Sequence, residues 1–159
     1  MMTIRSIESL MREKEGSKRQ SMAQVLTNMS DGFFIYNATG DEEILYANPS
    51  VLKIFGCDTM DEFRKLVNNS FSGMVHPEDL DRVQKEIHHQ VKQSDRHMDF
   101  IRYRIVTKDG MIRWIDDCGH LEDNGSGSDS KLFYVFISDI TDTITEAEME
   151  RLLLLNVCY

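Results

Sequence analysis

Two adjacent carboxylates, Asp116 and Asp117, are the residues best suited by type and spacing to acid–base chemistry. They lie in a β-favouring stretch, and neighbouring side chains of a strand point to opposite faces, so the two cannot share a substrate proton. Asp117 falls on the same face as Ile115, Gly119 and Leu121, which we expect to point inward. A buried carboxylate needs a polar partner. Asp117 is therefore a candidate pocket residue, with a hydrogen bond to a nearby turn as the alternative.

The histidines have a spacing that argues against a haem site. His88 and His89 are adjacent in a predicted helix whose apolar face carries Val83, Ile87 and Val91. Adjacent helical side chains point about 100° apart, so both cannot enter one pocket, and we expect them at or outside the edge of this face.

Neither the remaining histidine near a helix start nor the cysteines indicate a catalytic or metal site. His76 precedes Pro77, and we interpret it as a helix cap, with a pH switch as the alternative. Cys57, Cys118 and Cys158 are far apart and form neither a disulfide framework nor a C-x-x-C metal clip. This cysteine usage favours the reducing cytoplasm.

Length and charge exclude several classes of partner. The 159 residues suit one compact domain with short extensions, and their formal net charge of −9 repels nucleic acid and anionic membranes. The apolar runs fall far short of the about 20 residues that span a bilayer, and no secretory leader opens the sequence. The Gly/Ser-rich loop 124–128 joins two predicted strands, whereas phosphate loops precede a helix.

The first half of the chain predicts mainly helices. Apolar residues at helical spacing predict a flanking helix within 1–29, interrupted at Gly16. The runs 33–36 and 44–47 then predict a β-hairpin. Three helices should follow, and the residues that begin them are Asn48-Pro49, Thr59 with Glu62, and His76-Pro77.

The second half predicts mainly strands. Residues 98–107 and 111–121 flank a turn at Asp109-Gly110 and predict a second hairpin. A central strand is expected within 131–140, and a capping box from Thr143 to Glu146 opens a terminal helix. The predicted fold class is α+β: a five-stranded antiparallel sheet with helices packed on one face.

Residues 30–142 resemble a PAS (Per-Arnt-Sim) sensory domain with its C-terminal PAC motif. The resemblance rests on short motifs that occur in the family's order. They are Asp31-Gly32-Phe33, Tyr46-Ala47-Asn48-Pro49, Phe55-Gly56, Glu62-Phe63, Val75-His76-Pro77-Glu78-Asp79, Arg104 to Gly110 followed by Arg113-Trp114-Ile115, and Ser138-Asp139-Ile140-Thr141-Asp142. The resemblance implies a small interior pocket between the sheet and the helices, and a role as a sensor or dimerisation module.

The resemblance also bears on cofactors and ligands. Flavin-binding relatives carry an Asn-Cys-Arg-Phe-Leu-Gln motif that this sequence lacks, and haem-binding relatives place a histidine near the position of Gln84. We therefore expect no flavin, haem or metal, and leave an unknown small ligand open. The candidate pocket residues are Ile35, Tyr46, Phe55, Val75, Ile87, Ile115 and Asp117.

The end of the chain carries the expected signal path. By resemblance, Asp139 and Thr141 form the signal joint between the last strand and the helix predicted over 143–159. That helix contains four consecutive leucines, which span more than one helical face; they are Leu152, Leu153, Leu154 and Leu155. We expect them to pair with a helix of a second copy or with the 1–29 helix, and the alternative is packing back on the same domain.

Two functional hypotheses follow. The first is a cytoplasmic sensory and signal-relay domain that acts through its terminal helix on an output domain outside this chain, a histidine kinase or a diguanylate cyclase. The second is a ligand-free module that forms a homodimer through its flanking helices, with the interior packed solid. Neither hypothesis places a catalytic site in this chain.

Overall fold

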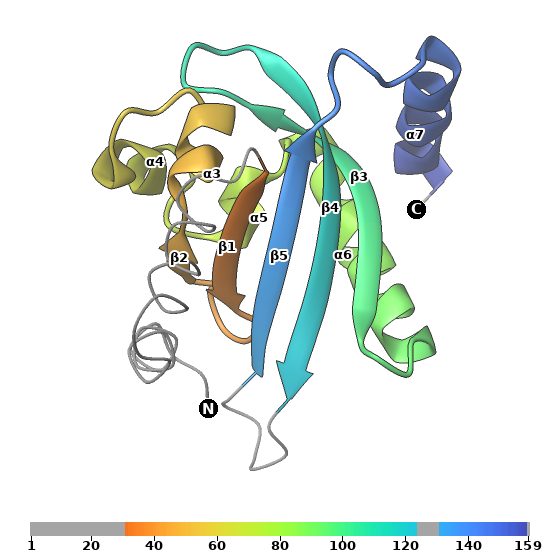
Figure 1. Ribbon diagram of the computed structural model, residues 1–159. Helices are drawn as coiled ribbons and strands as arrows, with labels where there is room; N and C mark the ends of the chain where they lie inside the picture. Colours follow the sequence, from red (N-terminus) through yellow and green to blue (C-terminus); the bar gives the residue numbers. More distant parts are fainter. Residues whose placement is uncertain (1–30, 124–130, 159) are drawn as a thin grey trace, which may run out of the picture.

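The computed structural model describes residues 31–123 and 131–158 (Figure 1). The helix predicted within 1–29 lies outside these residues. The described elements, in chain order, are β1 (Gly32–Asn37), β2 (Ile44–Ala47), α3 (Pro49–Ile54), α4 (Met60–Leu66), α5 (Phe71–Met74), α6 (Pro77–Gln93), β3 (Met98–Val106), β4 (Ile112–Asp123), β5 (Lys131–Asp139) and α7 (Glu146–Cys158). Of the described elements, only α5 was not predicted from the sequence, because its four residues are too few to show a helical repeat.

The strands form one antiparallel sheet in the order β2-β1-β5-β4-β3, which confirms the predicted fold class. The last strand in sequence, β5, lies in the middle, as predicted. Helices α3 to α6 pack on one face, which we call the inner face, and α7 lies beside α6, past the β3 edge (Figure 1). None of the described helices is long and apolar enough to cross a membrane.

The inner core between the sheet and the helices contains a group of stacked aromatic rings. Tyr36 of β1 stacks on Phe71 of α5, with ring centroids 4.6 Å apart, and on Phe133 of β5 at 5.0 Å. Phe34 and Tyr103 extend the group, and all five side chains are buried. Burial of this apolar surface is the main stabilising contribution to the fold.

Helix starts follow the capping chemistry read from the sequence, with one correction. His76 caps α6 as predicted: its Nδ1 accepts a hydrogen bond from the backbone N–H of Glu78 at 3.0 Å. The predicted box at Thr143 does not open α7. Thr145 is the cap instead, and its Oγ1 accepts from the backbone N–H of Glu148 at 3.2 Å. Each threonine is followed three positions later by a glutamate, Glu146 after Thr143 and Glu148 after Thr145, so the sequence pattern fits a helix start at either position.

Candidate functional site

Five of the seven predicted pocket residues lie in or against the inner core. All five are buried, and they come from the end of α3, the segment before α6, α6 itself and β4. They are, in this order, Phe55, Val75, Ile87, and Ile115 with Asp117. The structure therefore brings together residues from distant parts of the chain, in a core that the stacked rings largely fill.

The prediction for Ile35 and Tyr46 is wrong, because both lie on the outer face of the sheet. Ile35 belongs to a small cluster with Phe33, and Tyr46 packs against the same cluster. Phe34 and Tyr36 point to the helices, so Ile35 between them must point away. The whole run is apolar, so no polar residue in it revealed which side faces inward.

A buried polar group lies among the aromatic residues of the inner core. The Tyr103 hydroxyl donates to Asp117 Oδ2 at 2.5 Å, so the partner of Asp117 is a tyrosine and not a turn. Asp99 of β3 lies beside Asp117 on the inner face, because the β3–β4 register places it opposite Gly119, two positions after Asp117. Sequence analysis missed Asp99, although its alternation with Ile101 and Tyr103 places it on the inner face.

The exposed edge of β3 is closed by polar side chains of α6. Asp79 Oδ2 accepts from the backbone N–H of Arg104 at 2.8 Å. Further along, Gln90 accepts from the backbone N–H of Phe100 at 2.8 Å and donates to its carbonyl at 3.1 Å. A bare edge strand is a template for another strand, so these contacts protect the sheet from edge-to-edge pairing along this stretch.

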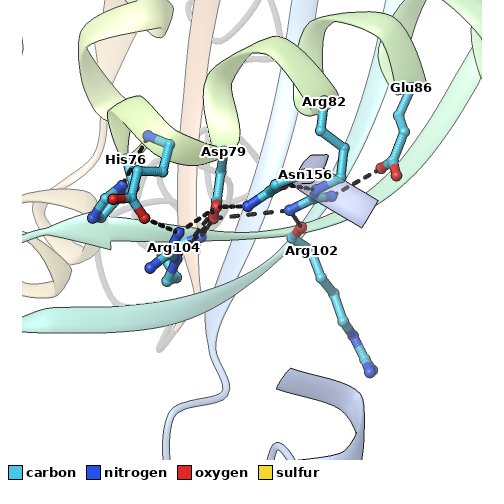
Figure 2. Close-up of polar contacts among 8 residues, drawn as sticks. His76, Asp79, Arg82, Glu86, Arg102, Arg104 and Asn156 are labelled. Carbon is cyan, nitrogen blue, oxygen red and sulfur yellow. Dashed lines mark hydrogen bonds and ion pairs between the residues drawn. The ribbon is translucent and has the colours of Figure 1, made fainter. Parts of the chain in front are cut away.

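A cluster of charged and amide side chains joins α6, β3 and α7 (Figure 2), and we call it the α6–α7 polar cluster; its members are Asp79, Arg82, Glu86, Arg104 and Asn156. Asn156 of α7 bridges an acid and a base: its Nδ2 donates to Asp79 Oδ1 and its Oδ1 accepts from Arg82 Nε, each at 2.6 Å. A side-chain amide suits this position because it both donates and accepts.

The charges of this cluster are buried and balanced. Asp79 and Arg82 are 0% and 1% exposed. Burial by itself raises the pKa of Asp79, but hydrogen bonds from the Arg104 side chain and backbone and from Asn156 outweigh it and lower the pKa below its usual value. Arg104 Nη2 lies 2.7 Å from Asp79 Oδ1, and its guanidinium lies 5.8 Å from the centre of the Trp114 ring.

Asp139 and Thr141, the predicted signal joint, fasten the end of β5 to β4. Asp139 Oδ1 accepts from the backbone N–H and the hydroxyl of Thr141, at 3.0 and 2.5 Å. Thr141 Oγ1 in turn accepts from the backbone N–H of Trp114 at 3.0 Å. The chain is thus held to the sheet just before it turns into α7.

The four leucines of α7 do not share one environment. Leu152 is 3% exposed, whereas Leu153 and Leu154 are 39% and 67% exposed. Helix α7 packs against α6, which is the fold-back arrangement that the sequence left as an alternative. The exposed leucines leave pairing with a further helix as a prediction.

A groove of about 720 Å³ lies on the outer face of the sheet beside α7. Its lining includes the exposed rings of Phe100 and Phe136. It also includes two ion pairs that share Arg102, one with Asp116 at 2.6 Å and one with Glu148 at 3.5 Å. Sequence analysis missed this groove because it depends on where α7 packs.

The residues considered for haem lie apart from the core. His88 and His89 are exposed, as expected, and Gln84 donates to Glu42 Oε1 at 3.1 Å. Within the described ranges, no group of three or more His, Cys, Asp or Glu side chains is placed to hold a metal ion.

Comparison with known proteins gives a family and a fold. The family model described as "PAS fold" matches residues 44–132. A search of curated protein sequences found no match. Among solved structures, the PAS domain of a protein from Colwellia psychrerythraea superposes with a TM-score of 0.61 at 16% identity, covering 77% of this chain and 97% of that one.

Two further similar structures come from signalling proteins. A sensory box histidine kinase/response regulator from Burkholderia thailandensis E264 gives a TM-score of 0.58 at 22% identity, covering 86% of this chain and 97% of that one. A domain of a sensory box sensor histidine kinase/response regulator from Geobacter sulfurreducens gives a TM-score of 0.53 at 22% identity, covering 77% of this chain and 96% of that one.

The buried charge of Asp79 should be essential for stability. Asp79→Asn should lower the free energy of unfolding by about 3 kcal/mol at pH 7, because it leaves Arg82 and Arg104 without their buried counter-charge. Asp81→Asn, on the same helix but 74% exposed in its side chain, should cost under about 0.5 kcal/mol. Urea unfolding measures both. The difference for Asp79→Asn should shrink below about pH 4, since a lowered pKa stabilises only while the carboxylate is ionised; equal losses in the two variants would contradict this assignment.

Proposed function

This chain belongs to the PAS fold family, and on that premise we propose that it is a sensory and signal-relay domain of a larger signalling protein. The likeness to domains of sensor histidine kinases supports a regulatory role. A histidine kinase is therefore the output that we propose first, and a diguanylate cyclase is the other output expected from the sequence. The proposed location is the cytoplasm.

The observation that carries this proposal is the way α7 is held. Helix α7 is held to the domain by the amide bridge from Asn156 to Asp79 and Arg82, by the burial of Leu152, and by the ion pair of Glu148 with Arg102. At its start it continues from the joint at Asp139 and Thr141. A change of the sheet that shifts β4 against β5 would reach α7 through this joint.

The proposed input is a small ligand or a partner that acts on the inner core. The residues proposed to respond are those of the inner face, with Asp117 as the polar contact. A ligand shifts the position of α7 only by its differential affinity for the docked and released arrangements. No flavin or haem enters the proposal.

Replacing the joint tests the relay. Asp139→Ala removes both hydrogen bonds to Thr141, and because Asp139 is exposed the free energy of unfolding should fall by only about 1 kcal/mol. Stimulated output of the full-length protein should be lost while the domain stays folded. Asp142→Ala, in the exposed turn that follows, is the control and should leave the output unchanged. Unchanged signalling in the Asp139 variant would remove the joint from the proposal.

The filled inner core favours a second candidate function, a ligand-free dimerisation module. The stacked rings of Tyr36, Phe71 and Phe133 occupy the space between sheet and helices. Leu154 and Val157, 67% and 84% exposed, form an apolar strip on the side of α7 available to a second copy. Here pairing of helices would be the whole function.

Native mass spectrometry of freshly purified protein separates the two functions. The relay with a small ligand predicts a retained mass above that of the polypeptide. The ligand-free module predicts a bare dimer that Leu154→Glu converts to a monomer, because a buried carboxylate replaces an apolar contact. A bare monomer would count against the module.

A further inference from the structure

Asp99 and Asp117 form an inner carboxyl pair on adjacent strands. In the β3–β4 register, Asp99 lies opposite Gly119 and Asp117 lies opposite Ile101, so the two aspartates are diagonal neighbours on the inner face. Glycine at 119 makes room for the acid, since a Cβ there would lie 2.9 Å from both carboxyl oxygens of Asp99. The absence of a side chain at Gly119 therefore lets the two carboxyl groups lie side by side in the β3–β4 pair.

The pair has no basic partner. In the described part of the chain, no lysine, arginine or histidine forms an ion pair or side-chain hydrogen bond with either carboxyl. Tyr103 donates to Asp117, and Asp99 Oδ1 is buried without a hydrogen-bond partner. Because no cation balances them, ionisation of one buried carboxyl disfavours ionisation of the other.

The surroundings offer little else to balance a charge. Helix α6 and strand β5 face this core with apolar side chains such as Val83, Ile87 and Val135. The titratable groups that act on the pair, or on which the pair acts, come from β1, β3 and β4; they are Tyr36, Tyr103, Asp116 and Cys118. None of these supplies a positive charge.

We propose that the inner carboxyl pair is a proton-binding site, in which Asp117 holds one proton and donates it to Asp99. At low pH Asp99 is protonated as well. As the pH rises, Asp99 loses its proton to solvent first and leaves a charge in the core that no cation balances, while Asp117 keeps its proton to a higher pH. This unbalanced charge weakens the β3–β4 ladder and makes the stability of the domain depend on pH. The site does not depend on the relay proposed above.

The direction of the effect follows from linkage. Burial raises the pKa of Asp99 to about 6, and burial together with the charge of Asp99 raises the pKa of Asp117 well above its usual value. An unfolded aspartate titrates near about 3.9. The folded state thus keeps protons that the unfolded state has released. The contribution of Asp99 is therefore fully present below about pH 4 and is lost as the pH rises through about 6, whereas Asp117 loses its proton at a higher pH.

Unfolding by urea between pH 5 and pH 8 tests the site. The unfolding equilibrium constant of the wild type should rise at least about 10-fold over this range. Asp99→Asn and the double variant with Asp117→Asn should abolish most of this rise, because burial of Asp99 is its main cause. Asp116→Asn is the matched control, because it removes a carboxyl from the neighbouring position on the outer face. A wild-type dependence no steeper than that of Asp99→Asn would overturn the proposal.

A second measurement remains available if the variants do not fold. Carbon-13 NMR of the aspartate carboxyl groups follows each titration in the wild-type protein. Two aspartates should titrate above pH 5, with each shift responding to the other. Titration of every aspartate below pH 5 would also overturn the proposal.

Discussion

The arrangement of this domain depends on how the edge strand β3 is covered. The backbone N–H and C=O groups on the free side of β3 have no neighbouring strand and need other hydrogen-bond partners. Helix α6 supplies them with side chains, and two of these, Asp79 and Arg82, carry charges that are buried in doing so. A buried charge is stable only with full hydrogen bonding. Asn156 completes that bonding from α7, so closing the sheet edge also fixes the terminal helix.

The contacts that hold α7 to the domain are few and can be named. Burial of Leu152 contributes about 2 kcal/mol, and hydrogen bonds to charged groups contribute about 1.5–3 kcal/mol each. A ligand or partner that releases α7 must have a differential affinity for the released arrangement that outweighs these contacts.

Much of the fold could be predicted from the sequence because its signals are local. The caps at Asn48 and His76, the turn at Asp109-Gly110 and the inward alternation around Asp117 each depend on a few neighbouring residues. The predictions that failed concern features that depend on contacts between distant parts of the chain. Ile35 was assigned to the wrong face because a wholly apolar run does not show which of its residues face the helices. Asn156 was overlooked because its hydrogen-bond partners lie more than 70 positions away in the sequence.

Amide hydrogen exchange along α7 tests the central claim that Asn156 holds this helix to the buried charges of α6. Asn156→Ala should speed exchange of the α7 amides at least about 10-fold, the equivalent of about 1.4 kcal/mol, while exchange in β1 and β5 stays as in the wild type. Leu154→Ala, on the exposed side of α7, should leave the rates nearly unchanged. Equal exchange in the wild type and Asn156→Ala would show that α7 is held by other contacts, and would contradict the account.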